Sequence, residues 1–202
     1  MAEFTTGGRS AGPADSQWIW DNYRCSLQQR CLSPGCYRSE VAMAYMEDLS
    51  NYGYADSVFS RPGTKAIGWL ARGHEFPRMA PEEEILELLW QYCSISVALM
   101  RGGHDCEFCP SGSARQALRH GEERLLGVAE IRVFSRDGQI YAAPTLIYHY
   151  AAVHHYRPPD EFLEALRAGS RPPSQAYFDI LARLKLEWSK TSSGGRSFRL
   201  FP

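Results

Sequence analysis

The chain has 202 residues, with 22 basic and 23 acidic side chains and 44% hydrophobic residues, so we expect a globular protein with one hydrophobic core. A net charge of −1 provides no concentration of Lys and Arg, which argues against nucleic acid and anionic membranes as partners. No apolar run is long enough for a membrane-spanning helix and the polar start lacks the features of a signal peptide, so we expect a cytoplasmic protein whose six cysteines are thiols or metal ligands.

The first stretch, residues 1–44, is rich in Gly, Ser, Gln and Arg and shows neither a helical nor a strand period. We interpret it as a poorly ordered or atypical N-terminal extension, and either Met43 or Met46 could be the natural start. Its cysteines are spaced by six and five residues, which matches no common metal-binding pair; they are Cys25, Cys31 and Cys36.

The compact part begins with a short expected strand at residues 65–70, followed by a helix that opens near Pro81. Three glutamates at residues 82–84 are favourable at the N-terminus of that helix, which is the positive end of its dipole. Apolar side chains then recur on one face as far as Tyr92. Alternating side chains at residues 94–100 indicate a further strand, which leads into a loop that contains two cysteines.

Residues 111–124 are expected to be a polar loop. After it, alternation at residues 127–134, the turn Asp137-Gly138 and the run 139–143 predict a β-hairpin over about 127–143. Pro144 is suited to open a helix that Pro158 and Pro159 must end.

Two more helices are expected near the C-terminus. The first spans residues 160–168 and ends at Gly169, where a left-handed residue is favoured. The second follows Pro173 and carries an apolar stripe that reaches Trp188. We therefore predict the α+β class, with a small central antiparallel sheet flanked by helices, in a single metal-binding domain over 45–190 and a flexible tail over 191–202.

The segment His104-Asp-Cys106-Glu-Phe-Cys109 carries the clearest chemistry. A Cys-x2-Cys turn presents two thiolates to one tetrahedral ion, so we expect zinc as the cofactor, with Cys106 and Cys109 as the first two ligands. The alternative is a pair of ordinary thiols beside unrelated histidines.

Two further ligands are needed for a closed site. We rank His149 next and then His104 or His154, since His155 is no better directed. On an ideal helix, positions 149 and 154 point about 140° apart, so both could bind one ion only if the helix bends or unwinds.

Seven segments resemble a family of small uncharacterised bacterial proteins. They include a His-x-Cys-x2-Cys loop and a His-Tyr-x3-His-x-Tyr-x-Pro-Pro segment, and the likeness extends from Met46 to Leu166. The segments start at Glu47 (Glu-Asp-Leu-Ser), Gly68 (Gly-Trp-Leu), His74 (His-Glu-Phe-Pro), Gly103 (Gly-His-Asp-Cys-Glu-Phe-Cys), Ala129 (Ala-Glu-Ile-Arg-Val), Tyr141 (Tyr-Ala-Ala-Pro) and Ile147 (Ile-Tyr-His-Tyr). The resemblance implies a domain of unknown function with a Cys/His metal site, and it implies no reaction.

Two function classes follow. In the first, the zinc is structural and the protein acts through a protein partner. In the second, the protein is a zinc-dependent hydrolase or lyase with an open coordination position, in which Glu130, His154 or His155 moves protons and Arg132 or Arg157 holds an anionic substrate. The sequence contains no recognised catalytic motif that would decide whether the protein is an enzyme.

Overall fold

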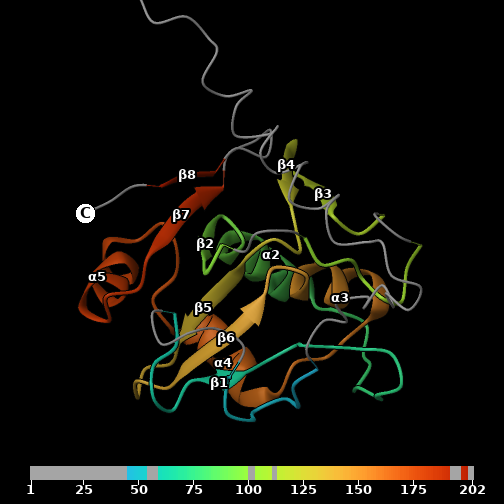
Figure 1. The fold of residues 1–202 in the computed structure, drawn as a ribbon, viewed down its shortest axis with the longest axis horizontal. Coiled ribbons are helices and arrows are strands. Elements are labelled where there is room, and N and C mark those ends of the chain that lie inside the picture. The colour runs from blue at the N-terminus through green and yellow to red at the C-terminus, as the bar shows by residue number, and fades with distance from the viewer. Residues whose placement is uncertain (1–44, 54–58, 100–102, 111–112, 192–196, 200–202) are drawn as a thin grey trace, which may run out of the picture. The chain divides into compact units, whose positions relative to one another are not determined.

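A mixed sheet of six strands runs through the computed structural model, which describes residues 45–53, 59–99, 103–110, 113–191 and 197–199 (Figure 1). Its strand order is β1-β6-β5-β2-β7-β8, in which β1 and β6 are parallel and the other neighbours antiparallel. The strands are β1 (Lys65–Ala66), β2 (Ile95–Val97), β5 (Glu130–Phe134), β6 (Ile140–Pro144), β7 (Trp188–Thr191) and β8 (Ser197–Arg199).

The β5–β6 hairpin is the centre of this sheet and confirms the hairpin predicted from the sequence. Ile131 pairs with Ala143 and Val133 with Tyr141, all of them buried. The turn uses Gly138 at φ 92°, a conformation that L side chains rarely adopt. The observed register therefore places apolar residues of the two predicted strands opposite each other.

The described residues form four helices: α2 (Glu83–Tyr92), α3 (Ile147–His154), α4 (Asp160–Ala168) and α5 (Gln175–Arg183). Helices α2 and α4 contact each other and β5, and α3 lies beside α2 (Figure 1). The predicted α+β class is confirmed. Among the described residues, no helix is long and apolar enough to span a membrane.

A second hairpin, formed by β3 (Gln116–Arg119) and β4 (Glu122–Leu125), lies where we expected a polar loop. Two arginines attach it to α2: Arg119 pairs with Glu83 and Glu87, and the Arg124 guanidinium lies 4.2 Å from the centre of the Trp90 ring. These contacts come from a segment about 30 residues earlier, so local alternation could not reveal the strands.

Helix α3 begins later, and helix α5 ends earlier, than the sequence predicts. Pro144 does not open the helix; it is the last residue of β6 and pairs with Glu130, and α3 begins at Ile147. The last predicted helix, α5, ends at Arg183, and Trp188 instead belongs to strand β7. Trp188 lies in a strand because its segment pairs with β2, and only the tertiary structure brings these two segments together.

Gly169 ends α4 as predicted, but for a different reason. Its backbone is extended, with φ −79° and ψ 168°, and not left-handed. A Cβ at this position would lie 2.1 Å from the carbonyl oxygen of Phe134 and 2.7 Å from that of Ala165. Glycine is needed here for the close approach of α4 to β5.

The stretch expected to be a flexible C-terminal tail contributes strand β8, which pairs antiparallel with β7. The predicted N-terminal extension, with Cys25, Cys31, Cys36 and Met43, lies outside the described residues.

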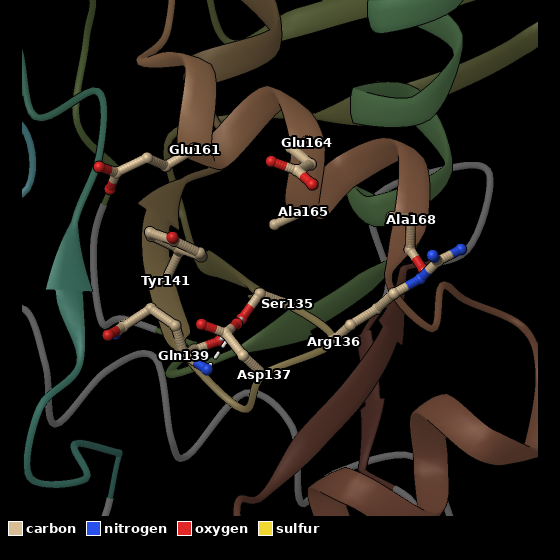
Figure 2. A pocket seen from close by; sticks show the side chains of 9 residues that line it. All are labelled: Ser135, Arg136, Asp137, Gln139, Tyr141, Glu161, Glu164, Ala165 and Ala168. Carbon is tan, nitrogen blue, oxygen red and sulfur yellow. Dashed lines mark hydrogen bonds between the residues drawn. The ribbon is translucent and has the colours of Figure 1, made fainter.

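A surface hollow of about 450 Å³ opens between the β5–β6 turn and α4 (Figure 2). Asp137, Glu161 and Glu164 make it acidic, with Arg136 at one side. None of the residues that the sequence proposes as metal ligands or as a general base lines it.

Candidate metal centre

The loop that carries Cys106 and Cys109 folds into a tight turn, in which the Cys109 amide donates to the Cys106 carbonyl at 3.3 Å. Phe108 lies between the cysteines and packs on Phe76, His154 and Tyr150, with ring centres 5.4, 5.4 and 6.1 Å apart. This aromatic contact anchors the turn on the core, so the two sulfurs are held on one side of the loop.

Backbone pairing with Gly127 fixes the start of the same loop. The His104 amide donates to the Gly127 carbonyl at 2.7 Å, and the Gly127 amide donates to the Thr145 hydroxyl at 2.9 Å. Gly127 has φ 75°, and a Cβ there would lie 2.2 Å from the His104 carbonyl oxygen. The chain can therefore approach the loop this closely only at a glycine.

We expect Gly127→Ala to lower both the stability and the metal affinity of the protein. The added Cβ meets backbone, which cannot rotate away, and the left-handed conformation adds strain, for a combined cost of about 2 to 4 kcal/mol. Urea unfolding with and without added zinc measures both effects. Gly121→Ala is a matched control, since Gly121 has a similar φ of 76° and open space around it. Equal losses in the two variants would mean that the contact with His104 is unimportant.

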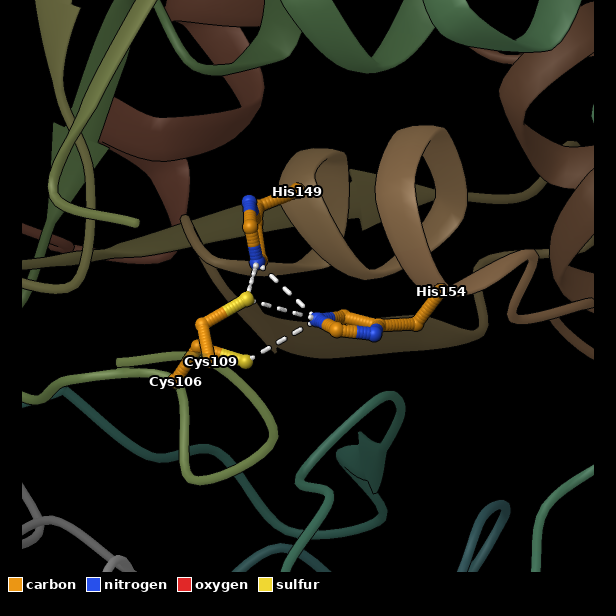
Figure 3. Close-up of side chains that lie close together, drawn as sticks. All are labelled: Cys106, Cys109, His149 and His154. Atoms are coloured by element: carbon orange, nitrogen blue, oxygen red, sulfur yellow. Dashed lines mark hydrogen bonds between the residues drawn. The ribbon is translucent and has the colours of Figure 1, made fainter. Parts of the chain in front are cut away.

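Helix α3 supplies two histidines, His149 and His154, and both side chains point at the cysteine loop (Figure 3). We expected an ideal helix to direct them about 140° apart. His154 is the last residue of α3, and His155 follows in the left-handed conformation with φ 57°. Because α3 ends at this point, the imidazole of His154 can turn back towards His149, whose ring lies 5.0 Å away, centre to centre.

The four potential ligand atoms converge, all within 4.8 Å of one another (Figure 3). The Nε2 atom of His154 lies 3.2 Å from each cysteine sulfur and 3.1 Å from Nε2 of His149, which is 3.4 Å from Cys109 Sγ. Ligands on a tetrahedral zinc ion, with bonds of about 2.0 to 2.3 Å, are separated by roughly 3.3 to 3.8 Å. The cluster is therefore close to the size and composition that a tetrahedral Cys2His2 ion requires.

Burial keeps most of the cluster uncharged without an ion. It raises the pKa of the Cys106 thiol to about 11, although the backbone amides of Phe108 and Cys109 act in the opposite direction by hydrogen bonding. It also lowers the pKa of His149 to about 4, with a further contribution from His154. The pKa of His154 is lowered by burial and by the nearby Arg78. Neutral imidazoles are ready to bind a cation, and the ion would compensate thiolates that burial otherwise disfavours.

The remaining histidine candidates lie outside this cluster. The structure brings together Cys106, Cys109, His149 and His154, and it does not include His104 or His155. His104 contributes its backbone to the loop, and His155 contributes its carbonyl, which accepts from the Met79 amide at 2.8 Å. The sequence left His104 and His154 as equal candidates for the fourth ligand, and the cluster contains His154.

Glu130, the candidate general base, is fully buried in strand β5. Its carboxylate accepts from the Tyr52 hydroxyl at 2.7 Å and pairs with Arg132, also buried, at 2.7 Å. Burial raises the pKa of Glu130, whereas the charge of Arg132 lowers it. Glu130 is not among the clustered ligands, and its carboxylate is used to hold Tyr52 and Arg132 in the core. Arg157, the other candidate anion ligand, pairs with Asp160.

The sequence did not predict that residues 72–76 contact the cysteine loop. The Arg72 amide donates to the Glu107 carboxylate at 2.8 Å, and Phe76 packs on Phe108. Tyr150, one residue after His149, is fully buried, and its hydroxyl has no hydrogen-bond partner among the described residues. The signal in the sequence for this support was Phe108, because a large apolar side chain inside the Cys-x2-Cys turn must pack against another segment.

A family model described as Domain of unknown function (DUF7919) matches residues 44–167, more than half of the chain. The chain belongs to this family. The match confirms the resemblance to a family of unknown function, and its limits lie within two residues of those expected from the sequence. All four residues of the Cys/His cluster and the Glu130–Arg132 pair fall inside the DUF7919 region. No curated protein and no solved structure matches the chain.

Proposed function

We propose that this DUF7919 protein is a zinc protein of the cytoplasm, in which one structural zinc ion joins the cysteine loop to helix α3 and the protein acts through a protein partner. The observation that carries the proposal is the convergence of Cys106, Cys109, His149 and His154 within 4.8 Å. These residues come from two segments about 40 positions apart, so one ion would cross-link them.

The donor set supports zinc over other ions. Two thiolates and two imidazoles suit a tetrahedral ion of intermediate softness, whereas calcium and magnesium require oxygen ligands. Four protein ligands also complete the tetrahedron. A catalytic zinc normally keeps one position for water, so the complete set and the engaged Glu130 favour the structural role over a hydrolase or lyase.

Four tyrosines are buried in the core and are therefore not available to a protein partner: Tyr52, Tyr148, Tyr150 and Tyr156. A zinc ion at the cluster would order the surface around the loop and the end of α3, which is the part of the protein that depends on the metal.

Elemental analysis of the purified protein tests the proposal directly. We expect about one zinc per chain, and a cobalt-substituted sample with the absorption of a four-coordinate site and two thiolate ligands. A five-coordinate spectrum would favour the hydrolase or lyase instead. Protein that neither contains nor takes up zinc would contradict the metal centre.

Zinc binding should release about two protons per ion at pH 7. Cysteine thiols are ordinarily protonated at this pH, and burial raises the pKa of Cys106 further, so each cysteine must lose a proton to become a ligand. His149 is already neutral, because its pKa is lowered to about 4. The apparent affinity should therefore rise about 100-fold from pH 6 to pH 7. Calorimetry in buffers of different ionisation enthalpy counts the protons, and a release near zero would exclude thiolate ligation.

A further inference from the structure

The two cysteines of the metal cluster differ from the third described cysteine in their surroundings. Cys106 and Cys109 lie three residues apart on one turn, and their sulfurs are within 4.8 Å of each other. Cys109 is half-buried at the surface, whereas Cys93 is buried at the C-terminal end of α2, with its thiol directed at the Thr145 carbonyl at 3.7 Å. Among the three described cysteines, only Cys109 combines exposure to solvent with a second sulfur nearby, that of the buried Cys106.

We propose that Cys106 and Cys109 form a reversible oxidation site, at which a hydroperoxide converts the zinc-bound thiolate pair into a disulfide and releases the metal. The proposal rests on the structural zinc site proposed above. Zinc ligation holds both cysteines as thiolates, the form that reacts with peroxides.

The reaction balances with hydrogen peroxide as the only oxidant. The Cys109 thiolate attacks one peroxide oxygen, the O–O bond breaks, and hydroxide leaves, which gives a sulfenic acid on Cys109. The Cys106 thiolate then attacks the Cys109 sulfur and displaces a second hydroxide. Two thiolates are oxidised by two electrons in total, and one peroxide is reduced to two hydroxide ions.

The geometry supports the second step. A disulfide requires the two sulfurs about 2.05 Å apart and the two Cα atoms within about 7 Å, a separation that the turn between Cys106 and Cys109 allows. The Cys109 sulfur is also the one in contact with both histidines, so its oxidation removes a ligand from the centre of the cluster.

Metal release follows because the disulfide sulfurs are poor ligands and only His149 and His154 remain. The loop then keeps its contacts through Phe108, Glu107 and Gly127 but loses its cross-link to α3. Peroxide would thereby change the surface around the loop and the end of α3, which the zinc ion orders.

The test treats the full-length, zinc-loaded protein with hydrogen peroxide in the presence of a chromophoric zinc chelator. We expect one zinc released for each Cys106–Cys109 disulfide, detected by mass spectrometry of a non-reduced digest. A thiol reductant and added zinc should restore the loaded protein. The Cys93→Ala variant serves as control and should release zinc at the same rate.

Three results would overturn the proposal. Zinc could stay bound while the cysteines remain reduced; the pair could be oxidised separately to sulfinic acids; or the new disulfides could join either cysteine to Cys25, Cys31 or Cys36. Absence of zinc from the untreated protein would overturn the metal centre as well, so the two failures are distinguishable.

Discussion

Cys106→Ser is expected to contain almost no zinc and to unfold at a lower temperature than the wild-type protein. The variant removes a thiolate from a four-ligand site, and the binding free energy of a structural metal is part of the folding free energy. With free zinc 1,000-fold above the dissociation constant, the metal adds about 4 kcal/mol to stability. A loss of this size lowers Tm by roughly 8 to 16 °C in a chain of this length.

Elemental analysis and thermal unfolding measure the two effects on the same sample. Wild-type protein treated with a chelator should unfold at the temperature of the variant, because both lack the ion. His155→Asn is the matched control: it changes an exposed histidine next to a ligand, and asparagine tolerates the left-handed backbone there. A Cys106→Ser variant with one zinc per chain and an unchanged Tm would refute the centre.

Glu130→Gln is expected to lower the free energy of unfolding by about 3 to 5 kcal/mol. The substitution keeps the shape of the side chain but removes its charge, which leaves the Arg132 guanidinium in the core without a counter-charge. The Tyr52 hydroxyl, which donates to both carboxylate oxygens, also loses a charged acceptor. Urea unfolding at saturating zinc measures the change.

The double variant Glu130→Met/Arg132→Met should recover most of that loss, since a buried ion pair can often be replaced by packed apolar side chains. Zinc content should stay near one per chain in both variants, because neither residue belongs to the cluster. An unchanged stability of Glu130→Gln would indicate that the buried pair is not structural and would return Glu130 to the role of candidate base.

The two halves of the Cys/His cluster differed in how far the sequence could predict them. Cys106 and Cys109 were recognised from their spacing, because a Cys-x2-Cys turn brings its two sulfurs together locally. The choice among the histidines could not be made in this way. It depends on where α3 ends, and the chain just after this end pairs with the distant segment around Met79, whose amide donates to the carbonyl of the left-handed His155.

Glu130 shows that residue type alone does not determine the environment of a side chain. Glutamate is rarely buried, so a strand glutamate is expected to face solvent. Its burial depends on Arg132, two positions along the same face of β5, and on Tyr52, which lies 78 residues earlier in the chain. Only the folded arrangement brings Tyr52 to that face of the sheet.

The sequence by itself determined the elements whose signals are local: the α2 stripe, the β5–β6 hairpin with its glycine turn, α4 between Pro159 and Gly169, and the cysteine turn. Periodicity and turn chemistry act between neighbouring residues, so these features can be read without knowledge of the fold. The tertiary structure alone decided the β3–β4 hairpin, the strand state of Trp188, the pairing of Glu130 with Arg132, and the arrival of both His149 and His154 at the cysteines. These features depend on contacts between distant segments, which are formed only when the core assembles.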